Sequence, residues 1–317
     1  MTRAKRYQSP ELEVQLLREG IIESVHAVHA VVCDSRGRML SVAGDAETAT
    51  FIRSALKPFQ ALAVAASGTL ERFELDDRDL AIMCASHHAH IEQVRQAFHI
   101  LWKAELEPSQ LQCPTPPDAK SPLEHNCAGK HAGMLALCQL HNWPLESYLH
   151  RNHPLQVQIL ATVADLLKMP ADEFIGAHDD CGVPTYLMPL NQMATLFAKL
   201  ASGDNLEMER IVRAMTHHPE LVAGAESFDT EVMRLTAGEV VSKSGAEGIQ
   251  CIGRVGEGMG LAIKARDGTK RAKYAVAVYL LKQLGWLSPD VSEELAEKYM
   301  VLSEYKRLDV QGDLDLM

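Results

Sequence analysis

The stretch SVHAVHAVVCDSRGRMLSVAG, residues 24–44, decides the fold that the rest of the chain has to fit. Valine and other small apolar residues run from Val25 to Cys33 with histidines between them, a composition typical of a β-strand. The polar run DSRG that follows predicts a turn, and residues 39–42 begin a second strand. The sequence therefore predicts a β-hairpin, and hairpins favour an antiparallel sheet.

Short β-rich segments return near the other end of the chain. Residues 239–245, 249–255 and 259–268 are rich in apolar and β-branched residues and are interrupted by glycine. A helical pattern follows them at 273–285. Ahead of the hairpin, residues 10–19 show the apolar spacing of a short amphipathic helix.

The middle of the chain is mostly helical. Apolar residues recur at positions i, i+3, i+4 and i+7 in four segments, which are 90–106, 129–141, 153–169 and 206–218. Two stretches that contain proline, 114–120 and 178–186, predict loops.

These patterns predict an α+β (mixed α/β) fold, with a single domain over residues 1–317. Its antiparallel sheet would take strands from both chain ends, about 21–45 and 239–285, and a largely helical portion would occupy about 55–236. No GxGxxG or phosphate-loop motif follows a strand, so the usual nucleotide-binding folds are excluded.

Composition limits the class of partner. The net charge is −11, and the two short basic runs, 3–6 and 264–273, are interpreted as solvated surface. No segment approaches the roughly 18 apolar residues of a membrane span, and the first residues lack the apolar core of a secretory signal. We therefore expect a soluble, cytoplasmic protein without a nucleic-acid or membrane partner. Its seven cysteines are expected to be thiols, some of them candidate metal ligands.

Ser54 and Lys57, in IRSALKPFQALAVAAS (52–67), are the first candidates for chemistry. Residues three apart share a helix face, so hydroxyl and amine can meet. Pro58 fits the first turn of a helix that begins near Ser54. Free main-chain N–H groups and positive potential at a helix start favour a serine nucleophile with a lysine base. The alternative is an ordinary helix with serine as its N-cap.

Lys243, in Lys243-Ser244-Gly245, is the second candidate. Serine acyl enzymes with a Ser-x-x-Lys helix often carry a Lys-(Thr/Ser)-Gly strand beside the nucleophile. The order of the two motifs is that of serine β-lactamases and of glutaminases of that fold. The alternative is a lysine at an ordinary strand end.

Ser86, in MCASHHAH (83–90), is a third candidate. It could be a second hydroxyl of the site, or the N-cap of the helix that starts at about His90. The three histidines at 87, 88 and 90 are interpreted as an exposed polar loop rather than as metal ligands.

One cysteine, a lysine and two histidines lie in HNCAGKHAGM (125–134), and two acidic residues precede a second cysteine in DDCGVP (179–184). Neither CxxC nor HExxH spacing is present, so spacing alone indicates zinc only weakly. The alternative is that the cysteines are buried as small apolar residues.

Six segments together resemble the rhizobial-type L-asparaginases. This family is similar in fold to serine β-lactamases and glutaminases and distinct from the threonine-dependent bacterial asparaginases. The segments are RSALKPFQALA (53–63), IMCASH (82–87), NCAGKHAGML (126–135), HDDCGVPTYLMPL (178–190), HPELVAG (218–224) and VSKSGAEG (241–248). Six motifs in one order are far more specific than any one of them. The resemblance implies a serine β-lactamase-like fold.

The resemblance implies two Ser–Lys tandems, Ser54 with Lys57 and Ser86 with Lys243. Such an enzyme would hydrolyse L-asparagine to L-aspartate and ammonia through an acyl-enzyme. The sequence does not choose which tandem attacks. One alternative is another serine amidohydrolase of this fold, such as a glutaminase or a β-lactam hydrolase, and a second is a non-catalytic metal-binding protein.

The resemblance also implies a zinc ion near the substrate, held by Cys127, Lys130 and Cys181. A lysine ligand must be neutral, and a nearby divalent cation favours that state. We expect the zinc to position the substrate rather than to supply the nucleophile. Candidate substrate contacts at or beside matched motifs are Arg53, His131 and Asp179. We expect a homodimer, since enzymes of this size often are.

Overall fold

The computed structural model describes residues 9–317 and divides into two compact units. Unit 1 contains the described residues up to Thr50, with Met188–Ser202 and Ser242–Met317. Unit 2 contains Phe51–Leu187 and Gly203–Val241. The assignment of residues 1–317 to one domain stays a prediction.

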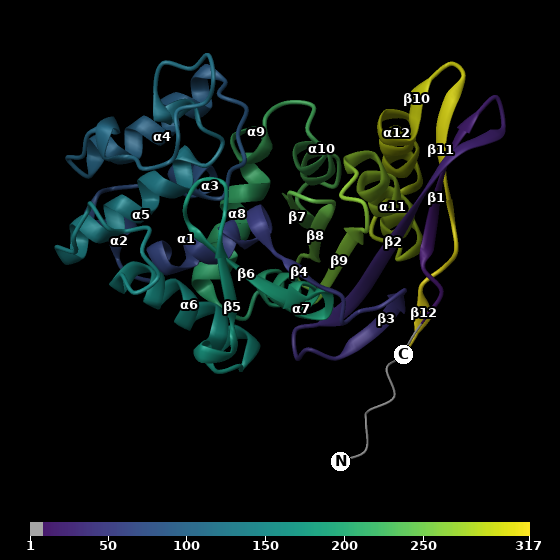
Figure 1. The fold of residues 1–317 in the computed structure, drawn as a ribbon, viewed down its shortest axis with the longest axis horizontal. Coiled ribbons are helices and arrows are strands. Elements are labelled where there is room, and N and C mark those ends of the chain that lie inside the picture. Colours follow the sequence, from purple (N-terminus) through teal and green to yellow (C-terminus); the bar gives the residue numbers. More distant parts are fainter. Residues whose placement is uncertain (1–8) are drawn as a thin grey trace. The chain divides into compact units, whose positions relative to one another are not determined.

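Unit 1 is built on a mixed sheet-and-helix plan with an antiparallel sheet in the order β10-β11-β1-β2-β9-β8-β7 (Figure 1). β3 pairs with β2, and β12 pairs with β3. The strands are β1 (Leu12–Arg18), β2 (Ile21–Asp34), β3 (Met39–Ala43), β7 (Val240–Gly245), β8 (Ile249–Arg254), β9 (Met259–Ala265), β10 (Val301–Ser303), β11 (Lys306–Gln311) and β12 (Asp315–Leu316). The predicted antiparallel sheet from both chain ends is confirmed.

The hairpin of β2 and β3 forms as the sequence predicts. The carboxylate of Asp34, the first residue of the turn, accepts hydrogen bonds from the main-chain N–H groups of Arg36 and Arg38 and so stabilises the turn. Gly37 adopts φ 82°, a left-handed conformation that glycine adopts without a steric cost.

The helix predicted at residues 10–19 is wrong, because this segment is strand β1. Leu12, Val14 and Leu16 are buried in alternation, but a register shift between Leu16 and Leu17 turns both leucines inward. Two adjacent buried leucines break the period of two, so the segment imitates helical spacing in the sequence.

Helices cover the sheet of unit 1. α7 (Leu190–Leu200) packs on β2, β8 and β9, while α11 (Lys270–Gln283) packs on β1, β9 and β11 and against α12 (Pro289–Met300). α7 comes so close to β9 that a Cβ added at Gly260 would lie 2.1 Å from the carbonyl oxygen of Ala194. Glycine is therefore required at this crossing.

The interpretation of residues 264–273 as solvated surface is wrong for its two end lysines. Lys264 and Lys273 are buried, and their ammonium groups donate to main-chain carbonyls of the β7–β8 turn and its neighbours. Carbonyl oxygens replace water around each charge, which is what makes such burial tolerable. The other basic run, 3–6, lies outside the described residues.

Unit 2 is largely helical, as predicted. The segments predicted as helices at 90–106, 129–141, 153–169 and 206–218 form α4, α5, α6 and α8. The helices are η1 (Arg53–Leu56), α1 (Lys57–Ala65), α2 (Thr69–Arg72), α3 (Asp77–Met83), α4 (Ile91–Lys103), η2 (Pro108–Gln110), η3 (Pro122–Glu124), α5 (Ala128–His141), α6 (Pro154–Leu167), η4 (Ala171–Glu173), α8 (Leu206–His217), α9 (Pro219–Ala223) and α10 (Phe228–Leu235).

The loop predicted at 178–186 is a short turn between two paired strands. β5 (Ile175–His178) pairs antiparallel with β6 (Pro184–Pro189). A third short strand, β4 (Ala49–Phe51), lies where the chain passes from unit 1 to unit 2. No helix within residues 9–317 has the length and apolar character needed to cross a membrane.

Candidate active site

The structure places nearly all of the predicted site residues in unit 2. Lys243 alone among them belongs to unit 1, on strand β7. The members in unit 2 are Arg53, Ser54, Lys57, Ser86, Cys127, Lys130, His131, Asp179 and Cys181. The pairing of Ser86 with Lys243 would join the two units, and it stays a prediction.

Ser54 and Lys57 lie where the 3-10 helix η1 runs directly into α1. Pro58 occupies the first turn of α1, as its missing N–H predicts. The residue before η1 is Ile52, so Ser54 is not the N-cap of this helix. Ser54 is half-buried and Lys57 is fully buried.

The ammonium group of Lys57 contacts Ser86. Its Nζ donates to Ser86 Oγ at 2.9 Å and to the carbonyl oxygens of Ala85 and Asn126. These partners lie between α3 and α4 and just before α5, so three segments of unit 2 meet at one cation. The 2.9 Å contact gives a direct path for a proton between the serine oxygen and the lysine nitrogen.

Ser86 is not a helix cap. His90 precedes α4, and its main-chain N–H donates to the side chain of Gln93. The main-chain N–H of Ser86 instead donates to the carbonyl of Val222 at the end of α9, which fixes the serine in the fold of unit 2.

Lys243 is fully buried in unit 1, on the Lys-Ser-Gly strand. Its ammonium donates to the carbonyl of Ser244 at 3.0 Å. The hydroxyl of Ser244 donates to Gln250, and Gln250 donates in turn to the hydroxyl of Ser242. Cross-strand hydrogen bonds between β7 and β8 therefore hold the strand that carries Lys243.

Cys127, Lys130 and Cys181 form a second cluster in unit 2. Cys127 precedes α5 and Lys130 lies in the first turn of that helix, while Cys181 lies in the β5–β6 turn. Lys130 Nζ donates to Cys181 Sγ at 3.1 Å, and the two thiol groups are hydrogen-bonded to each other. All three side chains are nearly inaccessible to solvent.

The charges within this cluster are coupled. The hydrogen bond from Cys181, together with the ammonium groups of Lys130 and Lys57, outweighs burial and holds the pKa of Cys127 well below its usual range. Donating that hydrogen bond, together with burial, raises the pKa of Cys181. Burial alone would lower the pKa of Lys130, but the two cysteines and Asp179 raise it. The Lys130 ammonium therefore favours the thiolate form of Cys127.

The donor set of this cluster fits zinc. Cysteine sulfur is a ligand that zinc prefers, a neutral lysine amine can supply a third donor, and three protein ligands leave a fourth position for substrate or water. Lys130 binds a metal only without its proton, and a divalent cation in place of that proton and of the Cys181 thiol proton leaves the net charge of the cluster unchanged. Within residues 9–317, no group of three or more His, Cys, Asp or Glu side chains could hold a metal ion. A zinc site here therefore depends on the lysine.

Arg53 and Asp179 contact each other. Arg53 Nε donates to Asp179 Oδ1 at 2.6 Å, and its terminal nitrogen donates to the exposed carboxylate of Asp180. Burial alone would lower the pKa of Arg53, but the two carboxylates outweigh it and raise the pKa. The salt bridge ties the segment that contains Ser54 to the turn that contains Cys181.

The backbone of Arg53 adopts φ 53°, in the left-handed region that non-glycine residues rarely occupy. Its main-chain N–H donates to Thr185 Oγ1 at 3.1 Å, on strand β6. Such strain persists only where the surroundings determine the conformation, and it is commonest at functional sites.

His131 is fully buried on α5. Its Nδ1 lies 2.6 Å from the hydroxyl of Tyr148, which also accepts the main-chain N–H of Gln112. Burial and the Lys130 ammonium hold the pKa of His131 well below its usual range. The imidazole is therefore neutral, and its contact with Tyr148 fixes its orientation.

Sequence patterns missed three residues near these clusters. Asp180 extends the Arg53 salt bridge, and Tyr148 orients His131, although no motif marks it. His87 was assigned to an exposed loop, but only 2% of it is accessible to solvent. The position of His87 directly after Ser86 was the one available signal.

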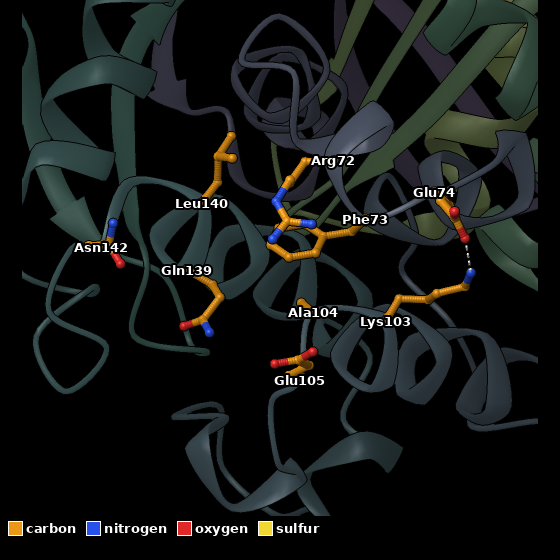
Figure 2. A pocket seen from close by; sticks show the side chains of 9 residues that line it. All are labelled: Arg72, Phe73, Glu74, Lys103, Ala104, Glu105, Gln139, Leu140 and Asn142. Carbon is orange, nitrogen blue, oxygen red and sulfur yellow. Dashed lines mark hydrogen bonds and ion pairs between the residues drawn. The ribbon is translucent and has the colours of Figure 1, made fainter.

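A polar pocket elsewhere in unit 2 does not include the predicted site (Figure 2). It is lined by residues at the C-terminal ends of α2, α4 and α5, which are 72–74, 103–105, 139, 140 and 142. The guanidinium of Arg72 lies over the ring of Phe73, and Lys103 pairs with Glu74 at 2.8 Å. The cations at this pocket are therefore already occupied by partners.

Comparison with solved structures finds chains of Mglu at low sequence identity. The native form of Mglu is 15% identical, with a TM-score of 0.49, and the match covers 82% of this chain and 64% of that chain. The native form in the presence of 4.3 M NaCl is 16% identical, with a TM-score of 0.38 and coverages of 82% and 61%. This chain thus spans less than two thirds of those solved chains, and TM-scores below 0.5 assign no fold.

Comparison with curated protein sequences gives no match. The profile of the family described as L-asparaginase II, by contrast, matches residues 14–316, nearly the whole chain. The match runs through both units and includes every site residue described above. The resemblance seen in the sequence is thereby confirmed, and the chain belongs to the L-asparaginase II family.

Proposed function

We propose that this protein is an amidohydrolase that converts L-asparagine to L-aspartate and ammonia through a serine acyl-enzyme. Membership of the L-asparaginase II family supports the reaction class. The observation that carries the mechanism is the buried contact of 2.9 Å between Lys57 Nζ and Ser86 Oγ. A serine hydroxyl is a weak nucleophile unless a base takes its proton.

In the proposed reaction, Ser86 Oγ attacks the side-chain amide carbon of asparagine while neutral Lys57 takes the hydroxyl proton. Lys57 then gives that proton to the amide nitrogen, the C–N bond breaks, and ammonia leaves. Water attacks the resulting ester, and Lys57 accepts one of its protons and gives that proton to the ester oxygen of Ser86, which leaves as a restored hydroxyl. Aspartate is released.

This assignment differs from the expected tandem of Ser54 with Lys57. Lys57 donates a hydrogen bond to the side chain of Ser86, which is 29 residues away in sequence, whereas the expected partner was Ser54, three residues before the lysine. In the proposal Ser54 is a second hydroxyl of the site. Lys243 remains the candidate second cation, as in the expected tandem of Ser86 with Lys243.

We also propose that zinc binds at Cys127, Lys130 and Cys181. When bound, zinc would polarise and orient a substrate oxygen as a Lewis acid. Cys127 is already disposed to be a thiolate, and Cys181 and Lys130 would each release a proton on binding. Arg53 holds Asp179 beside this cluster, which leaves the guanidinium and carboxylate in place for a zwitterionic amino-acid substrate.

An ammonia-release assay on L-asparagine and L-glutamine tests the proposal. Wild type should release ammonia from asparagine, and Ser86→Ala should abolish the release while Ser54→Ala retains part of it. Mass spectrometry of quenched reactions should find the aspartyl ester on the peptide that contains Ser86. An ester on Ser54 would reassign the nucleophile, and no release from either amide would favour a non-catalytic metal-binding protein. We also propose that the protein is a cytoplasmic homodimer, and analytical ultracentrifugation of the purified protein tests the dimer.

A further inference from the structure

His87 has one satisfied and one unsatisfied ring nitrogen. It lies between α3 and α4, directly after Ser86, and its main-chain N–H donates to the carbonyl of Asn126. Its Nδ1 accepts the main-chain N–H of Ala89 at 3.1 Å. A neutral imidazole that accepts at Nδ1 carries its hydrogen on Nε2.

The imidazole stays neutral at every pH at which the protein would work. Burial, and after it the ammonium of Lys57, lowers the pKa of His87 to about 3. The doubly protonated imidazolium, in which Nδ1 would be a donor, is therefore excluded. The hydrogen bond from the Ala89 main-chain N–H to Nδ1 selects the neutral tautomer with its hydrogen on Nε2.

The Nε2–H group of His87 is buried and has no hydrogen-bond partner among residues 9–317. A buried donor without a partner has lost its water and gained nothing in return, so each such group in a folded protein calls for an explanation. Poor local packing does not explain this one, because the other ring nitrogen and the main-chain N–H are both bonded.

The surroundings of His87 are those of the candidate active site. The ionisable groups that act on its ring are Lys57, Cys127, His125 and His88. Lys57 contacts Ser86, and Cys127 belongs to the proposed zinc cluster. A protonated nitrogen cannot bind a metal or a cation, so the missing partner must be an acceptor, and in a substrate of this class that means an oxygen.

We propose that His87 is a specificity-determining residue whose Nε2–H donates a hydrogen bond to a carbonyl or carboxylate oxygen of the bound substrate. This inference rests on the proposed amidohydrolase function. The donor is neutral, so it contributes direction and selectivity for an oxygen rather than a charge. Its backbone neighbour Ser86 is the proposed nucleophile, and the Asn126 carbonyl accepts both the main-chain N–H of His87 and the ammonium of Lys57, the proposed base.

Two substitutions separate the ring nitrogens of His87. His87→Asn keeps an acceptor near Nδ1 for the Ala89 N–H and removes the donor. His87→Gln reaches to the position of Nε2 with an amide N–H but gives up the acceptor. His88→Asn, at the exposed neighbour, is the matched control. Each variant is measured for kcat and KM on L-asparagine and for melting temperature, with all kinetics well below melting.

We expect His87→Asn to lose about tenfold in kcat/KM, the effect of one hydrogen bond, while His87→Gln recovers part of it and His88→Asn matches wild type. Unchanged kcat/KM in His87→Asn overturns the inference. Unchanged kcat/KM together with a lowered melting temperature would mean that the Nε2–H group donates to a buried water instead of to the substrate. Equal kinetic losses in His87→Asn and His87→Gln also overturn it, because a structural role would not distinguish the two side chains.

Calorimetry with L-aspartate distinguishes failure of this inference from failure of the proposed function. If wild type hydrolyses no amide, the proposed function fails, and weaker aspartate binding in His87→Asn than in wild type still supports the donor. Equal aspartate binding by the two proteins contradicts it, as does a wild type that binds neither asparagine nor aspartate.

Discussion

Arg53 and Asp179 meet through a hydrogen bond of 2.6 Å between Nε and Oδ1, although 126 residues separate them in the chain. The pair joins the segment that contains Ser54 to the β5–β6 turn that contains Cys181. One salt bridge thus holds together parts of both clusters of the candidate active site. The first prediction follows from it.

Arg53→Ala should lower kcat/KM by about 100-fold, because a displaced turn moves substrate-binding groups by distances that reduce catalysis on that scale. Asp180→Asn, at a carboxylate whose side chain is 89% exposed, is the control and should change kcat/KM less than about threefold. Steady-state kinetics on L-asparagine provides the measurement. Arg53→Gly separates backbone from side chain, since glycine accepts φ 53° without strain. Activity of Arg53→Gly near wild type would show that the guanidinium is dispensable.

Lys57→Met should lower kcat by about 100- to 10,000-fold, which is the usual contribution of a general base. The buried Ala85 carbonyl also loses its Lys57 donor, and the Asn126 carbonyl keeps only the main-chain N–H of His87, so the free energy of unfolding should fall by about 1–3 kcal/mol. Denaturant unfolding measures the second effect. If Lys57→Met unfolds like wild type and stays active, the lysine is not the base.

Metal removal should raise KM more than it lowers kcat, because zinc is proposed to position the substrate. Chelated protein and Cys181→Ser should behave alike, and added zinc should restore only the chelated wild type. Titration with zinc, followed by ammonia release, provides the measurement. A collapse of kcat at unchanged KM would assign the metal to the chemical step instead.

Acid should weaken unit 1 through Asp267. Burial alone would raise the pKa of its carboxyl, but hydrogen bonds from the Thr269 main chain and from His26 outweigh it and lower the pKa to about 2. Since the folded pKa lies below the unfolded value, the stabilisation is complete above about pH 4 and is lost as pH falls through about 2. The side chain is 46% exposed, so solvent screening limits the effect to about 1 kcal/mol or less. Asp267→Asn should therefore lower stability at pH 6 and leave it unchanged well below pH 2, as measured by denaturant unfolding.

Gly260→Ala should destabilise the protein by about 1–3 kcal/mol, which is the usual cost of overpacking. The added Cβ would lie 2.1 Å from the carbonyl oxygen of Ala194 in α7. Gly176→Ala is the matched control, since its Cβ would find no neighbour closer than 3.6 Å. Thermal unfolding compares the two. Equal melting temperatures would mean that α7 shifts freely on β9.

The sequence predicted the elements with strong local signals. The Asp34–Gly37 turn and the helical periods of α4, α5, α6 and α8 are encoded within their own residues, so the hairpin and these helices are found where expected. Strand β1 was mistaken for a helix because the register shift at Leu16 removes its alternation. Register is set by partner strands, and no local pattern reports it.

In the candidate site, too, the residues could be predicted from local motifs, but their contacts with distant segments could not. Motif resemblance named Lys57 and Ser86, but it paired each with another residue, and only packing of α1 against the segment after α3 brings them within 2.9 Å. Burial of His87 likewise depends on segments distant in sequence. A histidine in a polar run looks the same in sequence whether it faces water or a lysine.

Strand β2 lies inside the sheet between β1 and β9, and its residue Val31 faces Ala262 across the ladder. About 230 residues must be synthesised between these two partners. At ordinary translation rates of about 5–20 residues per second, that delay is on the order of tens of seconds. Throughout it, the edge of β2 that pairs with β9 has no partner strand, so the nascent chain carries an open, valine-rich edge until β9 has been synthesised. Production of this protein should therefore depend on chaperone supply more than the final stability would suggest.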